Sequence, residues 1–180
     1  MKNKKFEIAS TESEIEWVGR KVTGSHNGTI AIKKGELILT DGKLTGGKII
    51  VDTTSIKVLD ITDPATNAQF AGHLVSDDFF STRKFPEATL EIISVANNHI
   101  VGNLTIKDII NAVGFHAEVN VDGDLVRATG KLVVDRTKYE MKFRSGSFFV
   151  NLGDSLIYND FELNVRVTAK AAGKLQNVLA

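Results

Sequence analysis

The chain has 180 residues, of which 42% are apolar and 24% charged, and this composition excludes a disordered or collagen-like protein. Its 22 Lys and Arg residues balance its 22 Asp and Glu residues, which argues against a general nucleic-acid-binding protein. The absence of cysteine excludes disulfide scaffolds, thiol catalysis and cysteine-ligated metals.

The first residues are rich in lysine, but Glu7 and Glu12 interrupt any apolar stretch, so no signal peptide is visible. No run approaches the roughly 18 apolar residues of a membrane-spanning helix. We therefore expect a soluble protein with one domain over residues 1–180. We expect it to be cytoplasmic as the sequence is written, and periplasmic if a signal peptide has been removed.

The first part of the chain alternates apolar and polar residues, which predicts half-buried strands. Residues 29–33 show this alternation, and Lys34-Gly35 predicts a turn before Leu37 and Leu39. Asp41-Gly42 predicts a hairpin before a strand over 44–52, because this pair tolerates positive φ angles.

Residues 42–48 have the glycine and lysine spacing of a phosphate-binding loop. However, Ile49 stands where Ser or Thr would bind magnesium, and a strand rather than a helix follows. These glycines therefore predict a hairpin turn and a bulge or close backbone approach.

A helical insertion over residues 63–80 interrupts the strands. Asp63-Pro64 is typical of a helix N-cap followed by proline at the first helical position. Ser76-Asp77-Asp78 predicts the cap of a second short turn that carries Phe79 and Phe80, and Pro86 ends the insertion.

Alternation returns after the insertion, most clearly over Phe115–Val121 and Phe161–Lys170. Asn97-Asn98 and Asp122-Gly123 predict turns between strands. The remaining predicted strands are 89–95, 100–106 and 125–134. In total the pattern predicts an all-β protein with eight to nine antiparallel strands, as a barrel or a sandwich.

Few residues suggest catalysis. Catalytic signatures are absent, and the histidines are far apart, which predicts neither an enzyme nor a metal site or cofactor. Asp135-Arg136, at the end of a strand, is interpreted as a chain corner or an ion pair. The aromatic residues form core or line a cavity, because an eight-stranded barrel is either filled or holds one small ligand.

The order and spacing of several motifs are similar to those of the YceI family, the lipocalin-like polyisoprenoid-binding proteins of bacteria. The resemblance runs from Glu14 to Ala169. After the segment 102–107, family members usually have a glycine and a threonine, whereas Asp108–Asn111 stand here, which predicts an altered hairpin tip. The motifs that carry the resemblance are 15–21 with 23–28, 47–56, 73–80 with 84–86, 102–107 and 135–139.

The resemblance implies an antiparallel lipocalin-like β-barrel of about eight strands, with a short helical insertion covering one end. It also implies an apolar tunnel for a long-chain isoprenoid or another amphiphile such as a polyprenyl phosphate, a quinone or a fatty-acid derivative. The protein would be a carrier or storage protein, without catalytic residues, and a homodimer. Two alternatives stay open: an enzyme of the same shape, or a stress-response or structural module without a lipid-carrier role.

Within this family framework, inward-facing residues are the predicted lining of the tunnel. Val119 is expected to face inward and Asn120 outward, because neighbouring strand residues point to opposite faces. Basic residues near a mouth would meet a phosphate or carboxylate head group. The predicted tunnel residues are Trp17, Leu104, Phe115, Val119, Phe143, Phe149 and Val165. The predicted head-group residues are Lys21, Arg83, Arg136 and Arg144.

Overall fold

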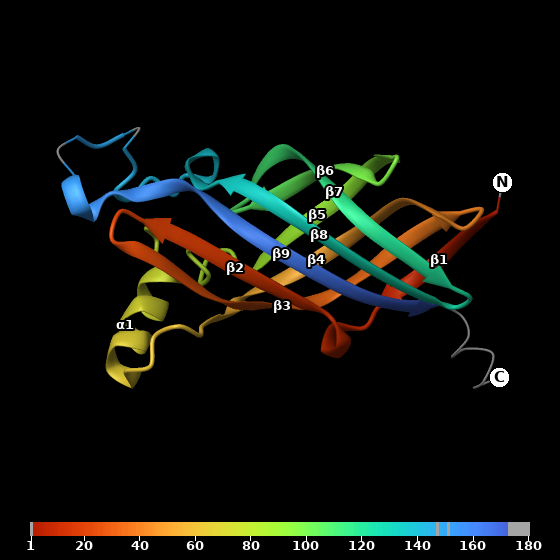
Figure 1. The fold of residues 1–180 in the computed structure, drawn as a ribbon, viewed down its shortest axis with the longest axis horizontal. Coiled ribbons are helices and arrows are strands. Elements are labelled where there is room, and N and C mark those ends of the chain that lie inside the picture. Colours follow the sequence, from red (N-terminus) through yellow and green to blue (C-terminus); the bar gives the residue numbers. More distant parts are fainter. Residues whose placement is uncertain (1, 147, 151, 173–180) are drawn as a thin grey trace.

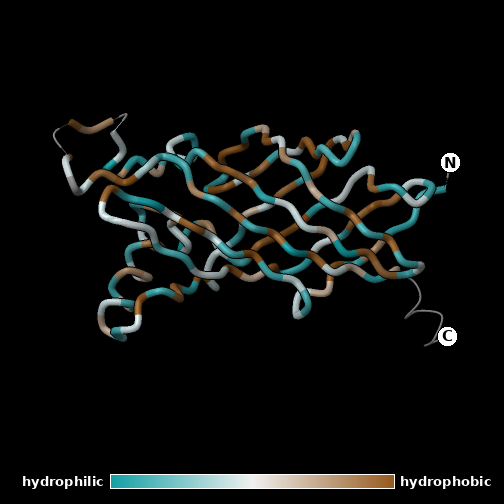
Figure 2. The backbone as a smooth tube through the Cα atoms, viewed as in Figure 1, coloured by the Kyte–Doolittle hydropathy of each residue, from teal (hydrophilic) through white to brown (hydrophobic). Residues whose placement is uncertain are grey.

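The alternating sequence forms antiparallel strands throughout the computed structural model, which describes residues 2–146, 148–150 and 152–172 (Figures 1 and 2). The strands are β1 (Asn3–Ile8), β2 (Glu14–Lys21), β3 (Gly24–Thr40), β4 (Lys43–Val58), β5 (Glu87–Ala96), β6 (His99–Ile106), β7 (Ile109–Asp122), β8 (Leu125–Asp135) and β9 (Ile157–Ala171). The helical segments are α1 (Pro64–Leu74) and the short 3-10 turns η1 (Ser10–Glu12), η2 (Arg136–Tyr139) and η3 (Gly153–Ser155).

The strands close into a barrel, as expected. The sheet runs in the order β1-β3-β2-β9-β8-β7-β6-β5-β4, and the pairing of β3 with β4 closes it. Strands β1 and β2 share one position around the barrel, between β3 and β9, because each of them pairs with both of these strands along different stretches. The barrel therefore has eight positions around its circumference although nine strands build it.

The hairpin turns follow the sequence signals, with one exception. Asp41-Gly42 and Asn97-Asn98 have the positive φ angles of tight hairpins, which confirms both predicted turns. The predicted turn at Lys34-Gly35 is wrong, because β3 continues through it. A register shift between Ile32 and Lys34 absorbs the irregularity. A Cβ atom on Gly35 would lie 2.6 Å from the Lys48 carbonyl oxygen, so this glycine permits a close strand approach rather than a turn.

The altered hairpin tip predicted over Asp108–Asn111 is shorter than expected. Lys107 and Asp108 have φ angles of 56° and 60° and form the turn, and β7 begins at Ile109. The residues after the turn already pair with β6. β7 therefore begins earlier than the alternation around Phe115 indicates.

The insertion begins as predicted but is helical only in its first part. The Asp63 carboxylate caps α1 by accepting hydrogen bonds from the Thr66 hydroxyl and the Thr66 N–H, and these bonds lower the pKa of Asp63. α1 ends at Leu74, and residues 75–80 form turns, which confirms the second short turn predicted to carry Phe79 and Phe80. The helix lies at one end of the barrel, opposite the end where β1 begins and β9 ends (Figure 1).

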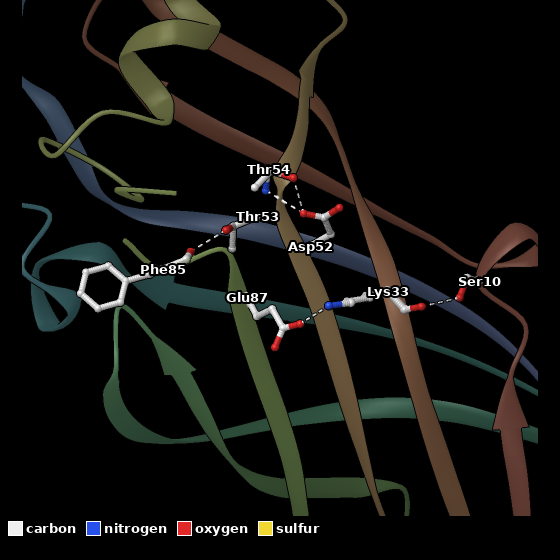
Figure 3. A network of polar contacts seen from close by, with 7 residues as sticks. All are labelled: Ser10, Lys33, Asp52, Thr53, Thr54, Phe85 and Glu87. Carbon is white, nitrogen blue, oxygen red and sulfur yellow. Dashed lines mark hydrogen bonds and ion pairs between the residues drawn. The ribbon is translucent and has the colours of Figure 1, made fainter. Parts of the chain in front are cut away.

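Polar contacts hold the segment between α1 and β5 against the barrel wall (Figure 3). The buried Thr53 hydroxyl donates to the Phe85 carbonyl oxygen at 2.7 Å, and the Thr53 N–H donates to the Pro86 carbonyl oxygen at 2.9 Å. On the outer surface, Lys33 of β3 pairs with Glu87 of β5 across the intervening β4. These contacts fix the position at which the returning segment joins β5.

The interior is packed differently in its two halves. At the end where β1 begins and β9 ends, buried side chains from β1 and from the facing halves of the longer strands fill the barrel. Toward α1, the inward-facing residues instead surround a cavity. The filled half includes Phe6, Ile8, Ile32, Leu37, Leu39, Leu44, Ile92, Ile100, Val126, Val167 and Ala169.

Phe6 tests how much β1 contributes to the filled half, since it is 1% exposed and its strand pairs with both β3 and β9. Phe6→Ala is expected to lower the free energy of unfolding by about 3–5 kcal/mol, because the lost burial leaves a cavity. Chemical denaturation measures the change. The neighbouring exposed Lys5→Ala is the control and should change stability far less. An equal loss in both variants would contradict the assignment.

Candidate functional site

The half of the barrel next to α1 encloses a cavity of about 300 Å³. Its wall is mainly apolar and comes from β2, β3, β4, β5, β6, β9, α1, η2, η3 and the turns that follow α1 and η2. The apolar lining consists of Ile15, Trp17, Gly19, Ile30, Val51, Ile56, Phe70, Leu74, Phe79, Phe80, Ala88, Leu104, Ile106, Met141, Phe143, Ile157, Phe161 and Leu163. Such a lining favours a hydrocarbon or ring system as the occupant.

Trp17 is held in the cavity wall by its own hydrogen bond. Its Nε1–H donates to the Lys57 carbonyl oxygen at 3.1 Å. The indole can lie there because position 28 has no side chain: a Cβ atom on Gly28 would lie 1.7 Å from the Lys57 oxygen and 2.6 Å from Trp17 Cζ2. Gly28 of β3 therefore permits the orientation of Trp17, the only tryptophan in the chain.

Aromatic contacts from α1 close the cavity on one side. The Phe70 ring stacks on Trp17, with 6.5 Å between centroids and 16° between planes, and lies 4.6 Å from the His26 ring. One turn later, the His73 ring packs against the Phe143 ring in a T-shaped arrangement, with 4.7 Å between centroids and 83° between planes. Because Phe70 and His73 are three positions apart on one helix face, a single face of α1 supplies both contacts.

Each of the two cavity histidines contacts a carboxylate. His26 Nδ1 lies 2.8 Å from Asp60 Oδ2, and His73 Nε2 lies 3.0 Å from Asp78 Oδ2. Burial raises the pKa of Asp60, but hydrogen bonds from the Asn27 N–H and His26 outweigh this effect, so the pKa lies below its ordinary value. The Asp60 contact ties the segment leading into α1 to β3.

Arg136 is a buried cation in the cavity wall, only 3% exposed. Its guanidinium donates to the carbonyl oxygens of Met141, Ile157 and Tyr158 at 2.5, 3.0 and 2.9 Å. None of the ion pairs found between described residues involves Arg136. Burial lowers the pKa of Arg136, and the nearby charge of Asp135 opposes that shift.

The charged residues around the cavity are mostly basic. Arg20 is paired with Glu162 at 2.8 Å, whereas Lys21 and Arg144 have no carboxylate partner in the part of the chain described. Arg144 instead lies over the Phe143 ring, 4.9 Å from its centroid. Asp160 is the one carboxylate among the described lining residues. The cavity therefore carries a positive bias.

The structure places some of the predicted site residues together. Six of them line the cavity: Trp17, Leu104, Phe143, Lys21, Arg136 and Arg144. The others lie elsewhere: Phe115, Val119 and Val165 pack against the filled core, while Phe149 and Arg83 are exposed. A role in ligand binding remains a prediction for all of them.

Several residues that line the cavity were not predicted from the sequence as site residues. Phe70 and His73 could have been found from their common face on α1, since the helix itself was predicted. Gly19 gave no signal, because nothing in a sequence shows that a Cβ atom there would meet no atom within 4 Å. Asp135-Arg136 does form a chain corner: Asp135 caps η2 by accepting from the Thr137 N–H at 3.0 Å.

Residues 2–146, 148–150 and 152–172 contain no cluster of three or more His, Asp or Glu side chains suited to a metal ion. None of their helices is long and apolar enough to cross a membrane.

Comparison with protein families and known structures agrees with the resemblance found in the sequence. A family model described as a YceI-like domain matches residues 6–169. The UPF0312 protein SAB2563 of Staphylococcus aureus (strain bovine RF122 / ET3-1) is 42% identical over 80 residues, which are 39% of this chain and 46% of that relative. The match therefore spans less than half the length of this curated relative.

Two solved structures share the fold across most of their length. BcnA of Burkholderia cenocepacia gives a TM-score of 0.66 at 17% identity and covers 89% of this chain and 98% of its own. A polyisoprenoid binding domain from Saccharophagus degradans, implicated in plant cell wall breakdown, gives 0.67 at 11% identity and covers 92% and 98%. At these identities the likeness is one of fold.

The contacts of Arg136 predict a large effect of a conservative substitution. Arg136→Lys keeps the charge, but one ammonium cannot replace a planar guanidinium that bonds three carbonyl oxygens. We expect the free energy of unfolding to fall by about 3 kcal/mol. Hydrogen exchange should also speed up at Ile157, whose N–H donates to the Arg144 carbonyl oxygen.

The matched control is Arg127→Lys on the exposed outer surface of β8, which should leave both quantities unchanged. Wild-type stability and exchange rates in Arg136→Lys would show that the three hydrogen bonds do not hold this corner.

Proposed function

Because the chain belongs to the YceI family, we propose that its cavity binds the apolar chain of a long-chain isoprenoid or related lipid and that the protein is a carrier or storage protein. The single observation that carries this proposal is the apolar cavity of about 300 Å³ beneath α1. The fold neighbour described as a polyisoprenoid binding domain supports the choice of an isoprenoid.

The physical driving force is the removal of hydrocarbon from water. Each buried CH₂ group contributes roughly 0.8 kcal/mol before the entropic cost of ordering the chain. The cavity volume lies at the lower end of the range of about 300–1,000 Å³ for small-molecule sites. We therefore propose that the cavity encloses one segment of a long chain, while the rest extends through the mouth.

The polar groups of the cavity support binding rather than catalysis. Thr53, His26, His73 and Arg136 each contact a group of the protein itself, which gives them a structural task. An enzyme of this shape would need an activated nucleophile or an acid–base pair aimed into the cavity. We propose a non-catalytic function on this basis.

The charges point to one class of head group. Lys21 and Arg144 lie at the cavity without a carboxylate partner among the described residues, and Arg136 is a third cation in the wall. A phosphate or carboxylate would be attracted to these cations and would accept their hydrogen bonds. We therefore propose an anionic amphiphile over a neutral one of equal chain length.

Gly19 offers a direct test of the cavity. It lies in the cavity wall, and a Cβ atom built on it meets no atom within 4 Å. Gly19→Leu should fill part of the cavity without a clash and should weaken the binding of a long-chain fatty acid or isoprenyl phosphate about tenfold or more. Trp17 fluorescence follows the titration, because this indole lies in the wall.

Gly72→Leu is the matched control, since its Cβ also meets open space but lies on the exposed surface of α1. Both variants should melt at or near the wild-type temperature, and only Gly19→Leu should lose affinity. If both bind as the wild type does, the cavity is not the binding site.

The head-group proposal has its own test. In the double variant Lys21→Gln with Arg144→Gln, affinity for a fatty acid should fall about tenfold, while affinity for the fatty alcohol of equal length should stay constant. Arg127→Gln, which removes an exposed charge on β8, should alter neither affinity. Equal losses for acid and alcohol would contradict recognition of the anion.

A further inference from the structure

Large apolar side chains gather at the cavity end of the molecule although they face solvent. Val150 is 85% exposed and Phe148 is 52% exposed. They belong to the loop between η2 and β9, which projects at the α1 end of the barrel, and part of its tip has hydrophobic colouring (Figures 1 and 2). We call the following residues the apolar rim: Val22, Phe148, Phe149, Val150 and Tyr158.

The rim is attached to a well-packed base. Ser145 is fully buried, its hydroxyl lies 2.5 Å from Asn159 Oδ1, and its carbonyl oxygen accepts from the N–H groups of Phe148 and Phe149 at 3.1 and 3.0 Å. The Val22 N–H donates to the Leu156 carbonyl oxygen at 3.2 Å, which joins the β2–β3 hairpin to the same loop. These hydrogen bonds therefore fix the backbone that carries the exposed Phe148 and Phe149 rings.

The rim adjoins the cavity through Tyr158 and lies among cations. Tyr158, Lys21 and Arg144 line the cavity themselves. Lys142 lies 4.7 Å from the centroid of the Phe148 ring and 3.3 Å from Glu140. The segment 142–150 contains two basic residues and no acidic one. Aromatic rings beside basic side chains are typical of surfaces that lie at a membrane interface.

We propose that the apolar rim docks on the surface of an anionic phospholipid bilayer, with the cavity mouth facing the lipid. Charge complementarity favours this occupant: Lys21 and Arg144, which have no carboxylate partner in the part of the chain described, attract anionic head groups, whereas the same cations on a second copy would repel each other. The inference goes beyond ligand binding, and docking on vesicles needs no cavity ligand.

The test is sedimentation of the full chain with vesicles of phosphatidylcholine, with and without phosphatidylglycerol. The wild type should bind the anionic vesicles, bind neutral vesicles more weakly, and lose affinity as salt is added. Phe148→Ser combined with Val150→Ser should weaken binding to anionic vesicles about tenfold or more.

The matched control is Ile93→Ser combined with Val101→Ser, which removes two exposed apolar side chains from β5 and β6, outside the rim. This control should bind vesicles as the wild type does. Fatty-acid titration monitored by Trp17 fluorescence should give wild-type affinity in the rim variant, since neither Phe148 nor Val150 is among the residues that line the cavity. The fatty-acid titration therefore tests the proposed cavity ligand, and vesicle sedimentation tests the docking proposal independently of it.

Two results would overturn the proposal. One is wild-type protein that stays in the supernatant with anionic vesicles. The other is a rim variant that binds these vesicles as well as the wild type does; if that variant also changes a dimer into a monomer of about the chain mass of 19.6 kDa, the rim is a contact between copies of the chain.

Discussion

The need to satisfy one buried guanidinium organises the cavity end of this barrel. Arg136 follows the last residue of β8 and bonds the carbonyl oxygens of Met141, Ile157 and Tyr158, so it joins the start of a long loop to its end. A buried cation without such acceptors would be strongly unfavourable. Because the loop is fixed at both ends, its base can line the cavity while its tip presents apolar side chains to solvent.

Much of the fold could be predicted because strand alternation and turn chemistry are local. The hairpins at Asp41-Gly42 and Asn97-Asn98 and the cap at Asp63 follow from the preferences of these residues alone. The turn predicted at Lys34-Gly35 was wrong because the sequence alone does not distinguish a glycine that permits close approach of two strands from a glycine that turns the chain. Only the partners of β3 on both sides decide between the two.

The cavity could be predicted only in part, since alternation shows which residues face inward but not whether the interior is filled. Leu163 and Val165 lie on the same face of β9, yet Leu163 lines the cavity and Val165 is not among its lining residues. The difference depends on which half of the barrel each residue occupies. Near the termini, β1 brings Phe6 and Ile8 into the interior, and no sequence period encodes that contribution.

The filled half leaves the α1 end as the route by which a ligand would enter. None of the residues of α1 is fully buried, and the helix is held by ring contacts at Phe70 and His73 and by hydrogen bonds from the Asn67 side-chain amide to the Val58 and Ile61 carbonyl oxygens. Local opening requires least free energy where few apolar contacts are lost. A ligand entering beside α1 would pass the basic residues at the mouth first and the aromatic wall second. An amphiphile drawn from a membrane would therefore leave its anionic head at the mouth and place its chain inside.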